Sequence, residues 1–197
     1  MFKGILKILL PNQRLNRSLR VLIVSNTMMV FVLGMFAPFY AIFVQRLGGS
    51  LAFAGFLWAV FCIVTGVLTL LFCRWGLRVK EQELLVALGY LLRSLVFLSY
   101  AFMESIPQLI FTQVLWGIAA AIGTPAFDAI YASHTERDHS IVQWGQWEGV
   151  ASIATGVAAL MAGFLIESLG FQIVFLVMAA ITTIIGIYIW VLPREVL

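Results

Sequence analysis

Long apolar stretches alternate with short polar breaks along the whole chain. The breaks hold nearly all of the charged side chains, and each apolar stretch runs for roughly 20 to 25 residues, which is the length a bilayer core about 30 Å thick requires of a helix. The pattern therefore predicts six membrane-spanning helices. Their expected bounds are 21–44, 51–72, 84–103, 107–133, 141–166 and 171–192.

Composition places the chain in the membrane class. It is 62% hydrophobic and 11% charged, which leaves too little polar surface for a soluble domain of 197 residues. Several connections are only a few residues long, so consecutive helices are expected to be antiparallel neighbours. We predict an all-α integral membrane protein with a basic amphipathic segment at 1–20, a six-helix bundle at 21–192 and a short tail at 193–197.

The distribution of Lys and Arg predicts the orientation. Arg46 is the one basic residue expected on its side of the membrane, Arg93 falls within an apolar stretch, and the remaining ten lie on the opposite side. By the positive-inside rule both termini lie in the cytoplasm, and we expect a multi-pass protein of the cell membrane. The net charge of +3 expresses this asymmetry, so lipid is the expected partner and nucleic acid is not. The residues on the basic side are Lys3, Lys7, Arg14, Arg17, Arg20, Arg74, Arg78, Lys80, Arg137 and Arg194.

Side chains suited to metal binding or catalysis are scarce. Cys62 and Cys73 lie on one predicted helix about 16 Å apart, too far for a disulfide, and His134 and His139 lie in a charged loop. Hydrolysis within a membrane requires a serine with a histidine, or paired aspartates, at depth. We therefore expect no metal, no cofactor and no enzymatic activity.

Two stripes of small residues follow helical spacing on the second and fifth predicted helices. Small residues let the backbones of membrane helices approach closely, so both stripes should face protein. Two interpretations stay open: packing within one bundle, or a surface for a second bundle. The stripes are Gly55, Ala59, Cys62, Gly66, Thr69 and Cys73, then Gly145, Gly149, Ser152, Gly156, Ala159 and Gly163.

A few charged residues fall inside the apolar stretches. Arg93 lies near the middle of the third predicted helix, where an unpaired charge costs about 3 kcal/mol or more. Glu148 and Asp128 are available to pair with it. A structural ion pair or snorkelling of Arg93 toward an interface would explain these groups. Alternatively they form a transport site, with Asp128 beside Arg74 and Arg78 as a gate at the cytoplasmic side.

The order of features resembles the amino-terminal half of major facilitator superfamily transporters. The resemblance covers the chain from about Arg20 to Leu192, and complete members of the family carry two such six-helix halves. The segments that carry it are Ala37–Val44, Gly48–Gly49–Ser50 with Ala54–Gly55, the basic loop after the second helix, Gly117–Ala126, and Gly163–Phe175.

The resemblance implies a central cavity lined by the first and fourth helices. Asn26, Tyr40, Gln113 and Trp116 then become candidates for substrate contact, together with Arg93 and Glu148 from the polar residues above. Two of the departures of this chain from the family pattern concern the gate and the cavity. Cys73 stands where the gate motif of the loop usually has an acidic residue, and Gln113 stands where the fourth helix often has arginine.

These observations predict a half-size membrane transporter of small solutes that works by alternating access. Two copies in the same orientation would form a parallel homodimer, because the halves of a complete facilitator are related by an axis along the membrane normal. Two alternatives stay open: half of a longer transporter that is inactive alone, or a membrane scaffold without transport. The expected interface consists of Gly55, Ala59, Gly66, Gly149, Ser152, Gly156, Ala159 and Gly163.

Overall fold

A computed structural model describes residues 17–76 and 78–193, and this part of the chain is helical with no strand. The elements are α2 (Arg17–Phe36), η1 (Ala37–Phe39), α3 (Tyr40–Arg46), α4 (Leu51–Gly76), α5 (Gln82–Ala101), α6 (Ile106–Ser133), η2 (Arg137–His139), α7 (Ser140–Leu169) and α8 (Phe171–Val191). Within these residues six spans are long and apolar enough to cross a membrane, which confirms the predicted all-α membrane fold with six long apolar helices.

The helix bounds follow the predicted ones closely. The largest shift is at the first helix, because α2 begins at Arg17 and so includes the last residues of the predicted amphipathic segment 1–20. The remainder of that segment, and residues 194–197 of the predicted tail, lie outside the described residues.

The first span is broken near its end, whereas α6 is not. Pro38 lies at the start of η1, a short 3₁₀ turn over Ala37–Phe39, and an α-helix resumes at Tyr40. Proline lacks a backbone N–H and so interrupts the hydrogen-bond ladder. Pro125 also lacks this donor, yet α6 runs continuously past it from Ile106 to Ser133.

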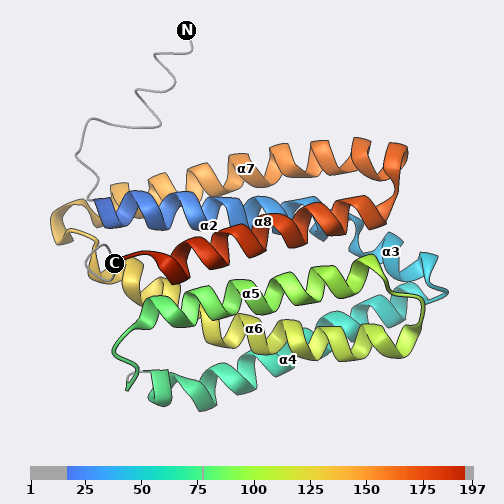
Figure 1. Ribbon diagram of the computed structural model, residues 1–197, viewed down its shortest axis with the longest axis horizontal. Helices are drawn as coiled ribbons and strands as arrows, with labels where there is room; N and C mark the ends of the chain where they lie inside the picture. Colours follow the sequence, from blue (N-terminus) through green and yellow to red (C-terminus); the bar gives the residue numbers. More distant parts are fainter. Residues whose placement is uncertain (1–16, 77, 194–197) are drawn as a thin grey trace, which may run out of the picture.

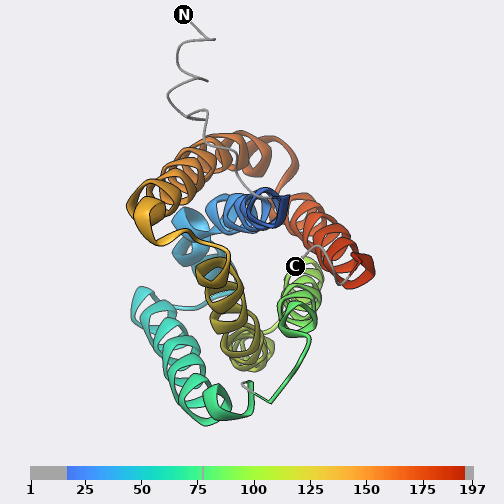
Figure 2. The same cartoon turned by 90° about the vertical axis from the view of Figure 1, so that its left-hand side faces the viewer.

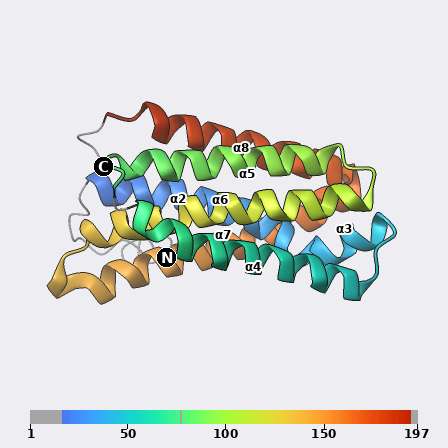
Figure 3. The same cartoon turned by 90° about the horizontal axis from the view of Figure 1, so that it is seen from below.

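The helices form a curved row rather than a closed ring. Principal neighbours follow the order α7, α2, α8, α5, α6, α4. Seen along the helices in Figure 2, α7 and α4 lie at the two ends of this row. Figure 3 places both on one side of the bundle and α8 on the other. In Figure 1 the start of α2 and the end of α8 lie at the same end, which we call the basic end because it carries Arg17, Arg20, Arg74 and Arg78.

Close helix packing inside the bundle depends on glycines at four crossings. A Cβ added at Gly89 would lie 2.7 Å from Gly123 Cα, so the backbones of α5 and α6 are in direct contact. Added Cβ atoms would be equally crowded at the three other crossings. These are Gly34 against Thr155, Gly117 against Val64, and Gly186 against Leu91.

The two predicted stripes lie elsewhere. A Cβ added at Gly55, Gly66, Gly145, Gly149 or Gly156 would meet nothing within 4 Å. Among the described residues these five glycines therefore take no part in close packing within the bundle. A Cβ added at Gly163 of the same α7 stripe would lie 3.5 Å from the ring of Phe39.

An aromatic cluster fills the bundle toward the end opposite the basic end. Phe36 contacts Phe175 with a ring-centroid separation of 4.9 Å, and Phe43 contacts the same ring at 4.8 Å. Tyr100 joins the group at 5.3 Å from Phe175. All four rings are buried, and the cluster fixes α2, α3, α5 and α8 against one another.

Candidate functional site

A cavity of about 600 Å³ opens between α2, α4, α5 and α6. This volume lies within the range of sites that bind small molecules. Its wall is mostly apolar, with a few polar groups placed among aromatic rings. The lining residues are Leu33, Ala37, Trp58, Phe61, Thr65, Thr69, Arg93, Trp116, Ala120, Thr124, Pro125 and Asp128.

Helical spacing explains how α4 and α6 supply most of this wall. On α6 the lining residues Trp116, Ala120, Thr124 and Asp128 recur every four positions, which aligns their side chains on one face. On α4 the lining residues 58, 61, 65 and 69 do the same at spacings of three and four. Each helix therefore presents an aromatic ring at one end of its stripe and polar oxygens toward the other.

Arg93 is the cation of the cavity. Its side chain is buried, with 7% of its surface exposed, and its Nη2 donates a 2.9 Å hydrogen bond to Thr124 Oγ1. The guanidinium carbon also lies 5.9 Å from the ring centroid of Tyr90. Within residues 17–76 and 78–193, no carboxylate lies within 4.0 Å of Arg93, and its Nε has no hydrogen-bond partner. Neither Asp128 nor Glu148 is therefore the ion-pair partner that the sequence offered.

Aromatic rings form the wall nearest the end opposite the basic end. Phe61 lies 5.0 Å from Trp116 and 5.2 Å from Trp58, measured between ring centroids. Trp58 and Trp116 meet edge to face at 6.4 Å. Such contacts hold large apolar surfaces in fixed positions and prepare a surface for a flat, apolar ligand.

Gln113 and Tyr40 lie in the packed interior and do not line the cavity. Gln113 is fully buried, and its Nε2 donates 2.8 Å hydrogen bonds to the hydroxyl oxygens of Tyr40 and Tyr100. Its Oε1 has no hydrogen-bond partner among the described residues. This polar cluster joins the first span to α5 and α6 directly behind Trp116, because Phe36 and Tyr100 both contact the Trp116 ring.

Two other predicted site residues also lie outside the cavity wall. Asn26 accepts a 3.2 Å hydrogen bond from the Tyr90 hydroxyl, which connects α2 to α5. Glu148 is exposed on α7. Of the six candidates for substrate contact, Arg93 and Trp116 line the cavity.

The predicted gate residues lie exposed toward the basic end. Arg74, Arg78 and Asp128 are all solvent-accessible, and no ion pair joins them in the part of the chain that the structure describes. Asp128 follows Thr124 by one helical turn, about 6 Å nearer the basic end. It therefore lies at the margin of the cavity, within the same wall as Arg93.

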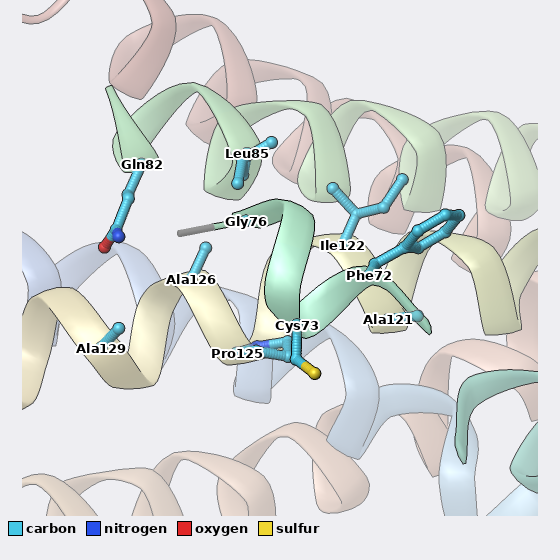
Figure 4. A pocket seen from close by; sticks show the side chains of 10 residues that line it. All are labelled: Phe72, Cys73, Gly76, Gln82, Leu85, Ala121, Ile122, Pro125, Ala126 and Ala129. Atoms are coloured by element: carbon cyan, nitrogen blue, oxygen red, sulfur yellow. The ribbon is translucent and has the colours of Figure 1, made fainter. Parts of the chain in front are cut away.

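A smaller cleft of about 120 Å³ lies on the other side of Pro125 from the cavity. Figure 4 shows it where the end of α4 meets the start of α5 and the second half of α6. Cys73, which stands in the acidic place of the gate motif, lines this cleft beside Phe72 and Gln82. The cleft is largely apolar, so the exchange of an acidic residue for Cys73 suits its surroundings.

Comparison with known proteins gives a consistent family relationship. The family model described as Major Facilitator Superfamily matches residues 22–196. The chain is also similar to the multidrug resistance protein MdtG of Dickeya zeae (strain Ech586), with 24% identity over 178 residues. That alignment covers 88% of this chain and 43% of the relative, so the chain spans less than half of the relative's length. No solved structure matches the chain at a significant level.

Proposed function

The chain belongs to the major facilitator superfamily, and we propose that it is a half-size transporter of small solutes that works by alternating access as a parallel homodimer. A transporter of this family has no enzymatic role. The name of the relative refers to multidrug resistance, which supports small organic molecules as the transported class. We place the protein in the cell membrane with its basic end in the cytoplasm.

The cavity at Arg93 and Trp116 carries this proposal. It combines a volume of about 600 Å³ with an aromatic wall and a buried cation, a combination suited to binding and orienting a small solute. A scaffold that only packs against other proteins has no use for an unpaired arginine in the membrane, because the charge costs about 3 kcal/mol or more.

The open stripes supply the means of dimerisation. In a parallel arrangement with an axis along the membrane normal, α4 of one copy meets α7 of its partner, and the same contact recurs on the other side of the axis. Gly55 and Gly66 on α4, with Gly149 and Gly156 on α7, have no side chains near them in one bundle. Two such bundles would enclose the cavity faces between them.

Alternating access would arise as one bundle rocks against the other. Asp128 lies at the margin of the cavity toward the basic end, and Arg74 and Arg78 lie on the same end. In a dimer, a carboxylate of one copy can pair with an arginine of either copy when that side closes. Release of the pair would open the cavity to the cytoplasm.

Two alternatives have specific support. The alignment covers only 43% of the relative, which fits half of a longer transporter that is inactive alone. The acidic place of the gate motif holds Cys73, which fits a scaffold that has lost transport. Solute flux in reconstituted vesicles separates both alternatives from the homodimeric transporter.

The experiment joins flux to oligomeric state. We expect the purified protein to have the mass of a dimer in nanodiscs, and cysteines placed at Ala59 and Ala159 on separate copies to crosslink. Gly66→Leu should abolish both dimer and flux, whereas Val67→Leu, which adds bulk at the neighbouring exposed position, should preserve them. A monomer that transports, or a Gly66→Leu variant that stays dimeric and active, would overturn the homodimer.

A further inference from the structure

We propose that the cavity binds a small amphipathic anion, with its carboxylate or sulfonate at Arg93 and Thr124 and its apolar body on the aromatic wall. This inference names the substrate class for the site and rests on the proposed transport function. The recognition elements are a buried guanidinium with unused donors, a hydroxyl that holds it in place, and three aromatic rings on one side of the cavity.

Arg93 has no negatively charged partner among the described residues. A guanidinium has five N–H donors, and the structure records one hydrogen bond from it, to Thr124. Its Nε is buried without a partner, and the ring of Tyr90 offers only partial compensation at 5.9 Å. Burial reduces screening by solvent and salt, so the charge acts strongly on a ligand in the cavity. A bound anion would accept hydrogen bonds from the guanidinium donors that reach the cavity, and it would neutralise the charge.

Asp128 does not form an ion pair with Arg93. Its side chain is exposed, and its carboxylate lies more than 4.0 Å from Arg93. It also lies one turn nearer the basic end than Thr124, about 6 Å along α6. Arg93 and Asp128 therefore form no ion pair, and the guanidinium keeps donors for a ligand. A ligand drawn to Asp128 would instead be a cation.

The remainder of the wall defines the body of the ligand. Trp58, Phe61 and Trp116 contact one another at ring-centroid separations between 5.0 and 6.4 Å. They present apolar surface in a cavity of about 600 Å³, which suits a ligand with one or two rings. Thr65 and Thr69 add hydroxyl groups from α4 without adding charge.

A matched pair of fluorescent probes tests the charge requirement directly. Anilinonaphthalene sulfonate is an aromatic anion, and N-phenylnaphthylamine has the same ring system without the sulfonate. Binding to the full chain in nanodiscs is followed by energy transfer from tryptophan, and signal from empty nanodiscs is subtracted. We expect the anionic probe to bind at least about tenfold more tightly than the neutral one, the effect of a hydrogen-bonded charge.

Two variants at Arg93 locate the effect. Arg93→Gln should weaken the anionic probe by about tenfold or more and leave the neutral probe within about twofold, whereas Arg93→Lys should retain part of the preference. Thermal unfolding of Arg93→Gln should occur at or above the wild-type temperature, because removal of an unpaired buried charge relieves its cost. A purely structural arginine would instead lower the unfolding temperature and weaken both probes equally.

Several results would overturn the inference. They are equal affinity for the two probes in the wild-type protein, equal loss of both in Arg93→Gln, and tighter binding of a cationic dye that depends on Asp128. The wild-type comparison needs no variant and decides the matter if Arg93→Gln fails to fold. Binding does not require flux, so anion selectivity without transport in vesicles would refute the proposed function alone. Flux of solutes without anion selectivity would refute this inference alone.

Discussion

Replacing Gly89 with alanine is expected to force α5 and α6 apart. The added Cβ would lie 2.7 Å from Gly123 Cα, and 3.1 Å from both the Ala119 carbonyl oxygen and the Gly123 nitrogen. Carbon atoms in ordinary contact lie about 3.5 Å apart or more, so the backbones must separate by about 0.8 Å at the crossing. The obstructing atoms belong to the backbone and have no alternative rotamer.

The cost follows from the packing around this crossing. Overpacking of a close-packed interior typically costs about 1–3 kcal/mol. Alanine recovers up to about 1 kcal/mol through its higher helix propensity, so we expect a net loss of about 1–2 kcal/mol in the free energy of unfolding. The separation also affects the cavity, because Gly123 directly precedes Thr124, which holds Arg93.

Equilibrium unfolding in mixed micelles measures the loss. The matched control is Gly145→Ala on α7, where an added Cβ meets nothing within 4 Å. This exposed change should not lower the free energy of unfolding, and it should raise it by up to about 1 kcal/mol through the higher helix propensity of alanine. If Gly89→Ala proves as stable as Gly145→Ala, the close contact between α5 and α6 is refuted.

Three further predictions concern the interior, the gate and the topology. Gln113→Leu should lower the free energy of unfolding by about 1–3 kcal/mol, because two buried hydroxyls lose their donor; unchanged chemical unfolding would contradict this. Asp128→Asn should slow flux in vesicles while the yield of folded protein stays normal, as expected of a gate residue. Loss of assembly with normal flux in the surviving protein would instead assign Asp128 to folding. An impermeant thiol reagent should label a cysteine at Gly49 only from outside the cell and one at His139 only from inside, and the opposite pattern would invert the topology.

The sequence predicts the spans well, because the bilayer fixes their length. Each predicted helix agrees with the structure to within a few residues. These features depend on local properties of the chain, so a sequence is sufficient for them.

The lining of the cavity is harder to predict, because lipid tails are as apolar as a protein core. Gln113 and Tyr40 looked like substrate contacts, yet they pair with each other in the interior. Phe61, Thr65 and Thr124 were missed although they line the cavity. A signal was present in the four-residue spacing of Trp116, Ala120, Thr124 and Asp128, which places two polar groups in line with an aromatic one.

The glycine stripes show the same difficulty. Spacing alone identifies a helix face of small residues, but only the arrangement of neighbours tells whether that face is occupied. Gly89 and Gly123, which belong to neither stripe, bring the backbones of α5 and α6 into direct contact. Five stripe glycines have no neighbour within 4 Å of an added Cβ, whereas Gly163 packs on Phe39, so spacing did not distinguish the two cases.

The 3₁₀ turn at Ala37–Phe39 connects α2 to α3 within the first span. On one side of it α2 packs on α7 and α8, and on the other side α3 packs on α4. A single span thus connects the two helices at opposite ends of the row. Any change in the separation of α4 and α7 would strain this turn, and Ala37 of the turn lines the cavity. A ligand that contacts Ala37 and restrains this turn would therefore restrain α4 and α7 together.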